Sequence, residues 1–317
     1  MEDDPAVYAP PDLERCLEFV RATSGGSREG VFGPASALWH VDREAVLFVG
    51  AGRALLMQLA HPWVATAISA HSTALDDPVG RFHRTFEIVF KLVFGSSDQA
   101  LATARRLHRL HAAVRGSMPE RLGPYAEGAP YFANEVSALQ WVHATLVDTA
   151  LVAYELVRPP LEPEMRERYY GESRRLGALF GIPPDAQPLD ASAFANYMGS
   201  MLSSEALAVG ADARRIGLRV LSGAGRVWVP RWYSDLTAAL LPERLRSSFE
   251  LPFGDQERRR AARAVNLIRH LYPALPARLQ YVAPYQEALS RLSGRQQPDL
   301  VTRTLNRLWI GRSSMSD

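Results

Sequence analysis

The sequence predicts an all-α fold, and three observations support this prediction. Apolar residues recur at spacings of three and four through most of the chain, and few stretches alternate with a period of two. Capping and stop residues, chiefly Asp, Ser, Gly and Pro, separate these periodic segments. Hydrophobic residues make up 47% and charged residues 22% of the 317 residues, which is typical of a globular body with a large core. We therefore expect a single large helical bundle.

The chain divides into three parts by its pattern. Residues 1–37 form a polar N-terminal arm with one short helix near Pro11–Ala22. Residues 38–290 form the helical body, and residues 291–317 form a polar C-terminal tail. This division predicts that one domain contains all of the chemistry.

The body begins with a helical pattern from Val41, in which Gly50 and Gly52 permit close helix packing or a break. Pro62 follows His61 directly, so we expect this helix to end or kink there. Asp76, Asp77 and Pro78 predict the start of the next helix. The segments expected to be helical after that point are Val79–Phe94, Ser97 to Gly116, Glu135–Val157, Glu162–Phe180, a helix capped by Asp190 or Ser192, residues 205–223, a short helix within 226–254, and a last long helix in 255–276.

Composition excludes several classes of protein. The formal net charge is +2 and nearly all positive charge is arginine, so we expect no nucleic-acid partner. Cys16 is the single cysteine, which excludes internal disulfides, thiolate zinc sites, iron–sulfur clusters and covalent haem attachment. Polar residues and a proline interrupt the longest apolar run, Ala45–Ala70, so we predict no transmembrane segment. The acidic N-terminus does not resemble a signal peptide, which predicts a cytoplasmic protein.

Arg81, Arg84 and Thr85 are the first candidate site residues. Their spacing of i, i+3 and i+4 puts the three side chains on one face of a helix. Two guanidinium groups and a hydroxyl suit an anion, such as a propionate or a phosphate. The alternative is an exposed charged stripe that pairs with nearby acids. These acids are Asp76, Asp77 and Glu87.

Histidines among apolar helical residues are the second group of candidates. His108 and His111 are three residues apart, so both can face one cavity. His143 lies in the apolar stretch EVSALQWVHATLVDTA, and His61 lies between two apolar helices. A neutral imidazole on a helix is the commonest axial ligand of haem iron. For each residue the alternative is a core histidine that is hydrogen-bonded to a backbone carbonyl group.

Other cofactor motifs are absent from the sequence. HExxH and ExxH do not occur, which argues against a zincin and a ferritin-type di-iron site. GxGxxG, the P-loop spacing and GxSxG are also missing. With these motifs excluded, the sequence indicates a helical body that has histidines and arginines in its interior.

Six motifs follow one another along the chain: RALLMQLAHPWVATAISAHS, DPVGRFHRT, RRLHRLHAAVRG, YFANEVSALQWVHATLV, YYGESRRLGALFGIP and ANYMGSML. In this order they resemble the catalytic-domain family of MpaB and the latex-clearing protein, a rubber oxygenase. The resemblance covers about Leu38–Leu279. It implies an all-helical fold with a globin-related core and a noncovalent haem b (heme b) held by a histidine.

The resemblance also implies roles for individual residues. The axial histidine of the family corresponds best to His111, which makes His111 the expected iron ligand. An arginine–lysine–threonine pattern of rubber-cleaving members corresponds to Arg81, Arg84 and Thr85, so Arg84 and Thr85 are the expected catalytic residues. Arg81 and Arg84 are also expected to bind the cofactor, and His61 is a further candidate. The remaining cofactor-binding candidates are His108 and His143.

One departure from the family pattern concerns a general base. Rubber-cleaving members are thought to use a glutamate on the helix before the arginine, whereas no acid lies between Arg53 and Asp76 here. We therefore do not expect rubber cleavage. The leading hypothesis is a haem b oxygenase or related oxidoreductase that acts with O2, and with a redox partner, on a small apolar substrate such as an isoprenoid. The first alternative is a haem or hydrophobic-ligand carrier or sensor without turnover, and the second is a helical scaffold with satisfied core histidines.

Overall fold

The computed structural model has the predicted all-α fold, and it describes residues 10–316 except 25, 27, 72–76, 224–227 and 296. The described elements are α1 (Pro10–Thr23), α2 (Ala37–Asp42), η1 (Ala45–Gly50), α3 (Ala51–Leu59), α4 (Pro62–His71), α5 (Pro78–Phe94), α6 (Ser97–Ala112), β1 (Arg115–Ser117), β2 (Pro130–Phe132), α7 (Val136–Tyr154), α8 (Pro163–Leu179), α9 (Ala191–Ser203), α10 (Ala211–Leu221), α11 (Arg231–Leu240), α12 (Glu243–Ser248), α13 (Asp255–Leu271), η3 (Tyr272–Ala274), α14 (Ala277–Gln280), α15 (Ala283–Leu292) and α16 (Leu300–Ile310). The two short strands pair antiparallel, with Gly116 opposite Tyr131.

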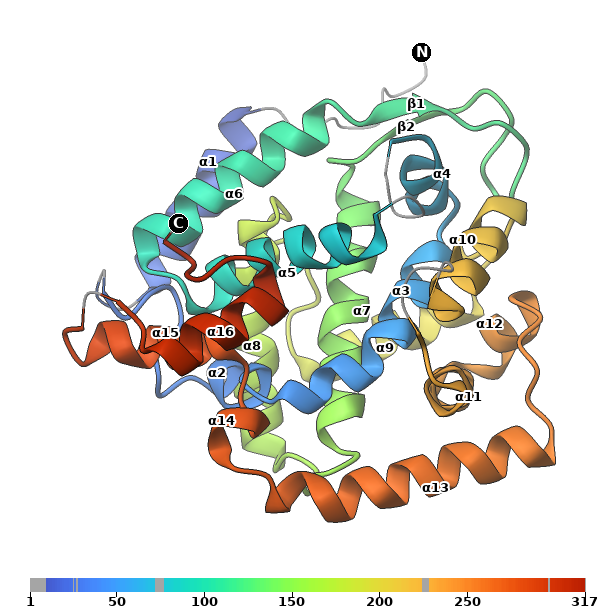
Figure 1. Cartoon of the computed structure of the whole chain (residues 1–317). Helices are drawn as coiled ribbons and strands as arrows, with labels where there is room; N and C mark the ends of the chain where they lie inside the picture. Colours follow the sequence, from blue (N-terminus) through green and yellow to red (C-terminus); the bar gives the residue numbers. More distant parts are fainter. Residues whose placement is uncertain are drawn as a thin grey trace.

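Helix α7 runs through the centre of the fold, and the other helices surround it (Figure 1). It packs on η1, α2, α3 and α8. Trp141 is fully buried and donates from its indole nitrogen to the carbonyl oxygen of Met57 at 2.9 Å. Gly50 permits the close approach of η1, because a Cβ atom there would lie 2.6 Å from Cγ2 of Thr149. The close packing expected at this glycine is therefore confirmed.

Helix α5 turns an aromatic row towards η1 and α16. Phe82, Phe86 and Phe90 lie one turn apart on α5 and pack around Phe48 of η1, with ring centroids 4.6–6.0 Å from it. Trp309 of α16 closes the same cluster at 4.4 Å from the Phe48 ring. Packing of these rings fixes the orientation of α5 in the bundle.

Several helix ends agree with the sequence, whereas both ends of α6 differ from it. The break before Pro62 and the start of α5 after Asp77, whose side chain accepts from the backbone of Gly80, are both as expected. The cap of α6 is Ser96 instead of Ser97, because Ser96 and Gln99 form a reciprocal capping box. Helix α6 also ends at Ala112 instead of near Gly116, because the chain from Arg115 pairs as β1 with β2.

Both ends of the described chain pack on the body. Helix α1 buries four apolar side chains in the common core: Leu13, Cys16, Leu17 and Val20. The expectation that residues 255–276 form the last helix is wrong, because α14, α15 and α16 follow. Helix α16 packs on α5 and α15, and Asn306 donates to Glu287 at 2.6 Å. The division into arm, body and tail remains a prediction.

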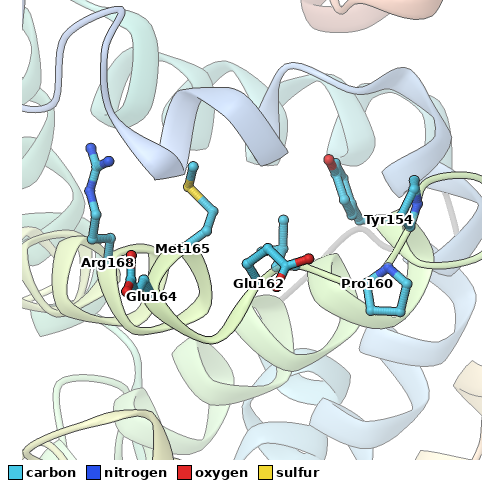
Figure 2. A pocket seen from close by; sticks show the side chains of 8 residues that line it. Tyr154, Pro160, Glu162, Glu164, Met165 and Arg168 are labelled. Carbon is cyan, nitrogen blue, oxygen red and sulfur yellow. The ribbon is translucent and has the colours of Figure 1, made fainter.

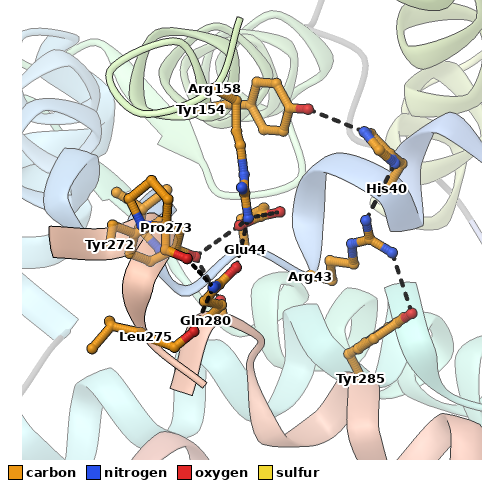
Figure 3. Close-up of polar contacts among 11 residues, drawn as sticks. His40, Arg43, Glu44, Tyr154, Arg158, Tyr272, Pro273, Leu275, Gln280 and Tyr285 are labelled. Atoms are coloured by element: carbon orange, nitrogen blue, oxygen red, sulfur yellow. Dashed lines mark hydrogen bonds and ion pairs between the residues drawn. The ribbon is translucent and has the colours of Figure 1, made fainter. Parts of the chain in front are cut away.

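A buried carboxylate connects three distant parts of the chain (Figure 3). Glu44, only 2% exposed, precedes η1 and accepts from Arg158 at 3.1 Å and from the Tyr272 hydroxyl at 2.8 Å. Arg158, which follows α7, also donates to the side chain of Gln280 in α14 at 2.7 Å. A carboxylate and a guanidinium that are removed from water destabilise the fold unless they pair with each other in this way. Glu44 thus ties η1 to the end of α7 and to the region around α14.

Helix α7 has a length and a hydropathy that would permit a membrane crossing. Within the described ranges it is the single helix of this kind, although residues 45–59 and 62–71, bent by 102°, meet the same criteria as a pair. More than half of the apolar window of α7 is buried inside the body, as in the core helix of a globular domain. The absence of a transmembrane segment remains a prediction from the sequence.

Glu44→Gln should lower the free energy of unfolding by about 2 kcal/mol or more, because Arg158 would be left without its charged partner. Urea unfolding followed by circular dichroism measures this change. The control is Glu127→Gln, which alters an exposed carboxylate in the loop between β1 and β2 and should leave stability nearly unchanged. Equal stability of the two variants would contradict the role given to Glu44.

Candidate functional site

His143 lies in the middle of α7 and is 4% exposed. Its ring is hydrogen-bonded to the backbone of Ser173 in α8, and its Nε2 is buried without a hydrogen-bond partner among the described residues. Burial lowers the pKa of His143 to about 4, an effect that the bond to Ser173 partly opposes, so the imidazole is neutral at pH 7. A ring held through one nitrogen, with the other nitrogen unpaired, is what a metal ligand requires.

His111 occupies the last turn of α6. The residue is half-buried, but its Nδ1 is shielded from water and has no hydrogen-bond partner in the described part of the chain. Burial, with a smaller contribution from His108, lowers the pKa of His111 to about 4. His111 is therefore a second neutral imidazole with a shielded, unpaired nitrogen.

The end of α6 and the middle of α7 converge on the end of α8. The side chain of Asn134, just before α7, donates to the carbonyl oxygen of His108 at 3.0 Å. The ring of buried His108 lies beside Gly181, since a Cβ atom on that glycine would be 3.6 Å from Nδ1. The adjacent Phe180 ring lies 6.0 Å from the ring of His143. The structure therefore brings His108 and His143 to one junction of α6, α7 and α8, and His111 is one turn further along α6.

His61 belongs to a different cluster, at the corner between α3 and α4. It is 2% exposed, and its Nε2 lies 3.0 Å from the hydroxyl of Tyr125, which comes from the loop between β1 and β2. Its Nδ1 and the indole nitrogen of Trp63 are both buried without a partner within the described ranges. Burial lowers the pKa of His61 to about 4. His61 therefore offers a further neutral imidazole, presented by other elements than the α6–α8 junction.

The predicted arginine face lies at the start of α5. Arg84 and Thr85 are exposed, and Arg84 donates to Asp77 at 3.1 Å. This ion pair corresponds to the alternative predicted from the sequence, an exposed arginine that pairs with a nearby acid. Both side chains are more than half exposed, so the pair contributes little to the stability of the fold. Arg81 is half-buried, and burial together with Arg84 lowers its pKa. The two arginines are neighbours, and the roles predicted for Arg81, Arg84 and Thr85 stay predictions.

The available donors fit a haem better than a bare metal ion. Within the described ranges no group of three or more His, Cys, Asp or Glu side chains is arranged to hold a metal. A haem iron needs only one or two protein ligands, and His111 and His143 each present a buried, unpaired nitrogen. Two neighbouring cations, Arg81 and Arg84, match the anionic propionates of haem.

A groove of about 430 Å³ opens at the connection between α7 and α8 (Figure 2). It is lined by Tyr154, Pro159, Pro160, Leu161, Glu162, Glu164, Met165 and Arg168. The hydroxyl of Tyr154 lies 3.0 Å from Nε2 of His40, whose Nδ1 faces the guanidinium of Arg43 at 3.4 Å (Figure 3). Because a guanidinium can only donate, Nδ1 of His40 accepts and Nε2 donates to the Tyr154 oxygen. This leaves the phenol hydrogen of Tyr154 available as a donor to another acceptor.

Sequence reasoning missed this groove and the partners of the histidines. In the sequence, Pro159 and Pro160 indicate only the end of a helix, and nothing links His61 to Tyr125 or His143 to Ser173. Both pairs join residues far apart in the chain, so only the packing of helices makes them visible.

Acidification should destabilise the fold through His61. Its folded pKa of about 4 lies below the 6.5 of an ordinary histidine, so between these values the unfolded chain binds more protons. The contribution of His61 to the free energy of unfolding therefore has its full value above about pH 6.5 and is lost as the pH falls towards 4. His61→Gln should show a shallower loss of unfolding free energy between pH 7 and pH 5, by up to about 1.4 kcal/mol per pH unit.

Urea unfolding at several pH values measures this slope. The control is His270→Gln, which removes an exposed imidazole on α13. A His61→Gln variant that loses stability with pH as steeply as the wild type would show that His61 does not contribute to this loss.

One of three comparisons with known proteins identifies a family. A search of curated proteins and a search of solved structures gave no significant match. The family model described as ER-bound oxygenase mpaB/B'/Rubber oxygenase, catalytic domain, matches residues 38–270, which include α3 to α8 and all the candidate histidines. The chain therefore belongs to the MpaB and rubber oxygenase catalytic-domain family.

Proposed function

We propose that this chain is a haem b-dependent oxygenase or related oxidoreductase that acts with O2 on an apolar, isoprenoid-type substrate. The family suggests an oxygenase, and rubber oxygenases are haem-dependent. The observation that supports the proposal most strongly is the pair of neutral imidazoles, His111 and His143, each with a shielded and unpaired nitrogen. Both histidines lie inside the region matched by the family model.

In this proposal His111 is the iron ligand, and the other residues hold the cofactor and shape its surroundings. A bound haem b would supply the binding and activation of O2 at its iron. Arg81 and Arg84 would hold propionates by charge-assisted hydrogen bonds, and Thr85 would add a hydroxyl donor. The apolar side chains of α7 around His143 would exclude water and keep the imidazoles neutral.

His108 and His61 are the further proposed contacts of the cofactor. His108 shares the α6–α8 junction with His143, and His61 presents its unpaired Nδ1 from the α3–α4 corner. We also propose, from the sequence alone, a redox partner and a cytoplasmic location.

Absorption spectra of two variants test the cofactor and its ligand. The wild type should gain a Soret band on addition of haemin, His111→Ala should lose it, and His143→Ala should keep it. His270→Ala is the matched control, since it removes an exposed histidine on α13. Circular dichroism establishes that each variant is folded. Loss of the band only in His143→Ala would move the ligand to α7, and a wild type that gains no band would refute the haem proposal.

Oxygen consumption with polyprenyl substrates separates an oxygenase from the alternative, a carrier or sensor. The alternative is favoured by one observation: residues 54–75 contain no Asp or Glu, so α4 lacks a carboxylate base. We expect the haem-loaded protein to consume O2 and form a shorter oxidised product. Spectral change on substrate addition without O2 uptake would instead identify a binding protein.

A further inference from the structure

Four exposed leucines follow one another at four-residue intervals from the end of α13 to α14. Leu267 and Leu271 of α13, Leu275 after η3 and Leu279 of α14 are 60%, 55%, 38% and 51% exposed. We call these four residues the leucine surface. Helix α13 lies along the outer edge of the fold, where it packs on α11 through small side chains such as Ala261 and Ala264 (Figure 1). Several exposed large apolar side chains in one region commonly mark an interaction surface.

Positive charge accompanies the leucine surface. Helix α13 contains five arginines and only two acids, and both acids, Asp255 and Glu257, lie in its first turn. Arg259 and Arg263 are exposed and precede Leu267 at the same four-residue spacing. Glu257 is already paired with Arg260 at 2.8 Å. Asp255, four residues before Arg259, is also exposed and adds one negative charge at the start of the helix. The exposed side of α13 is therefore apolar towards its C-terminus and has a net positive charge towards its N-terminus.

A second pair of apolar residues extends this surface. Leu300 and Val301, at the start of α16, are 77% and 50% exposed. The ion pair between Arg278 and Asp299, at 3.0 Å, holds the start of α16 beside α14, the helix that contains Leu279. Exposed apolar side chains are thus present on three segments: the end of α13, α14 and the start of α16.

The shape of the surface argues against a partner helix. Pro273 and Pro276 interrupt the chain between α13 and α14, so the four leucines do not form the regular stripe that helix–helix packing requires. A second copy of the chain would bring the same basic face against itself, which like charges oppose. A lipid surface needs no register between side chains, and its anionic phosphates complement arginine.

We propose that the leucine surface, with Arg259 and Arg263, docks on an anionic lipid membrane. The leucines enter the boundary between headgroups and acyl chains, and the two guanidinium groups bind lipid phosphates. Arg269 donates to the carbonyl oxygen of Leu156 at 3.0 Å, which holds this end of α13 on the α7–α8 connection. Docking would therefore place the groove that begins at Tyr154 close to the membrane. The inference does not depend on haem.

Co-sedimentation of the full chain with vesicles tests this proposal. Vesicles of phosphatidylcholine with one third phosphatidylglycerol should bind the protein, and vesicles of phosphatidylcholine alone should bind it much less. Binding should weaken in high salt, because exposed charges are screened. The double variant Arg259→Gln/Arg263→Gln should bind about twenty-five-fold more weakly, at roughly fivefold for each arginine. Leu267→Ser/Leu271→Ser should also lose binding, with an unchanged circular dichroism spectrum.

A matched control is Leu218→Ser/Arg219→Gln on α10, which lies away from α13 (Figure 1). Both residues are exposed there, so this variant should bind vesicles as the wild type does. No binding of the wild type to anionic vesicles, or equal binding by all variants, would overturn the proposal. Analytical ultracentrifugation gives a further test: a dimer that Leu267→Ser/Leu271→Ser abolishes would assign the surface to a second copy and overturn the lipid assignment.

Discussion

The burial of α7 is the constraint on which the rest of the structure depends. A helix at the centre of the fold must find a partner for each polar side chain that it carries, because an unpaired buried group costs about 1–3 kcal/mol. Arg53 supplies one such partner, donating to Asp148 and Thr149 at 2.6 Å each. Gln58 supplies another, donating to Thr145 at 3.1 Å. These pairs fix α3 against α7 and thereby set the corner from which α4 begins.

His143 is the exception along this helix, whose residues are all described. Its ring is satisfied at one nitrogen by Ser173 and left unpaired at Nε2. The cost of that unpaired nitrogen is removed by any ligand that binds it, which gives a physical reason for a cofactor in this part of the fold. His111 presents the same feature from α6. Both unpaired nitrogens belong to helices that meet at the end of α8. The haem proposal is therefore supported by the packing of the helices as well as by family membership.

The outer helices show the complementary situation. Helix α5 is fixed by the contacts of its phenylalanines with Phe48 and Trp309, which leaves Arg84 and Thr85 at the surface. Helix α13 buries small alanines and exposes leucines and arginines instead. In both helices the side chains that do not pack are those that suggest partners: an anionic group for α5, and an anionic lipid surface for α13.

The sequence by itself determined the all-α class, several helix boundaries and the family, because helical periodicity, capping residues and motif order are local properties of the chain. It also identified His108, His111 and His143 as candidates, since imidazoles among apolar helical residues need a partner. Only the tertiary structure decided which imidazole nitrogens lack a hydrogen-bond partner. It also decided that Arg84 pairs with Asp77 and that the terminal segments pack on the body. The globin relationship of the core stays a prediction. Hydrogen bonds such as those of Glu44 join residues more than 100 positions apart, and no local pattern encodes them.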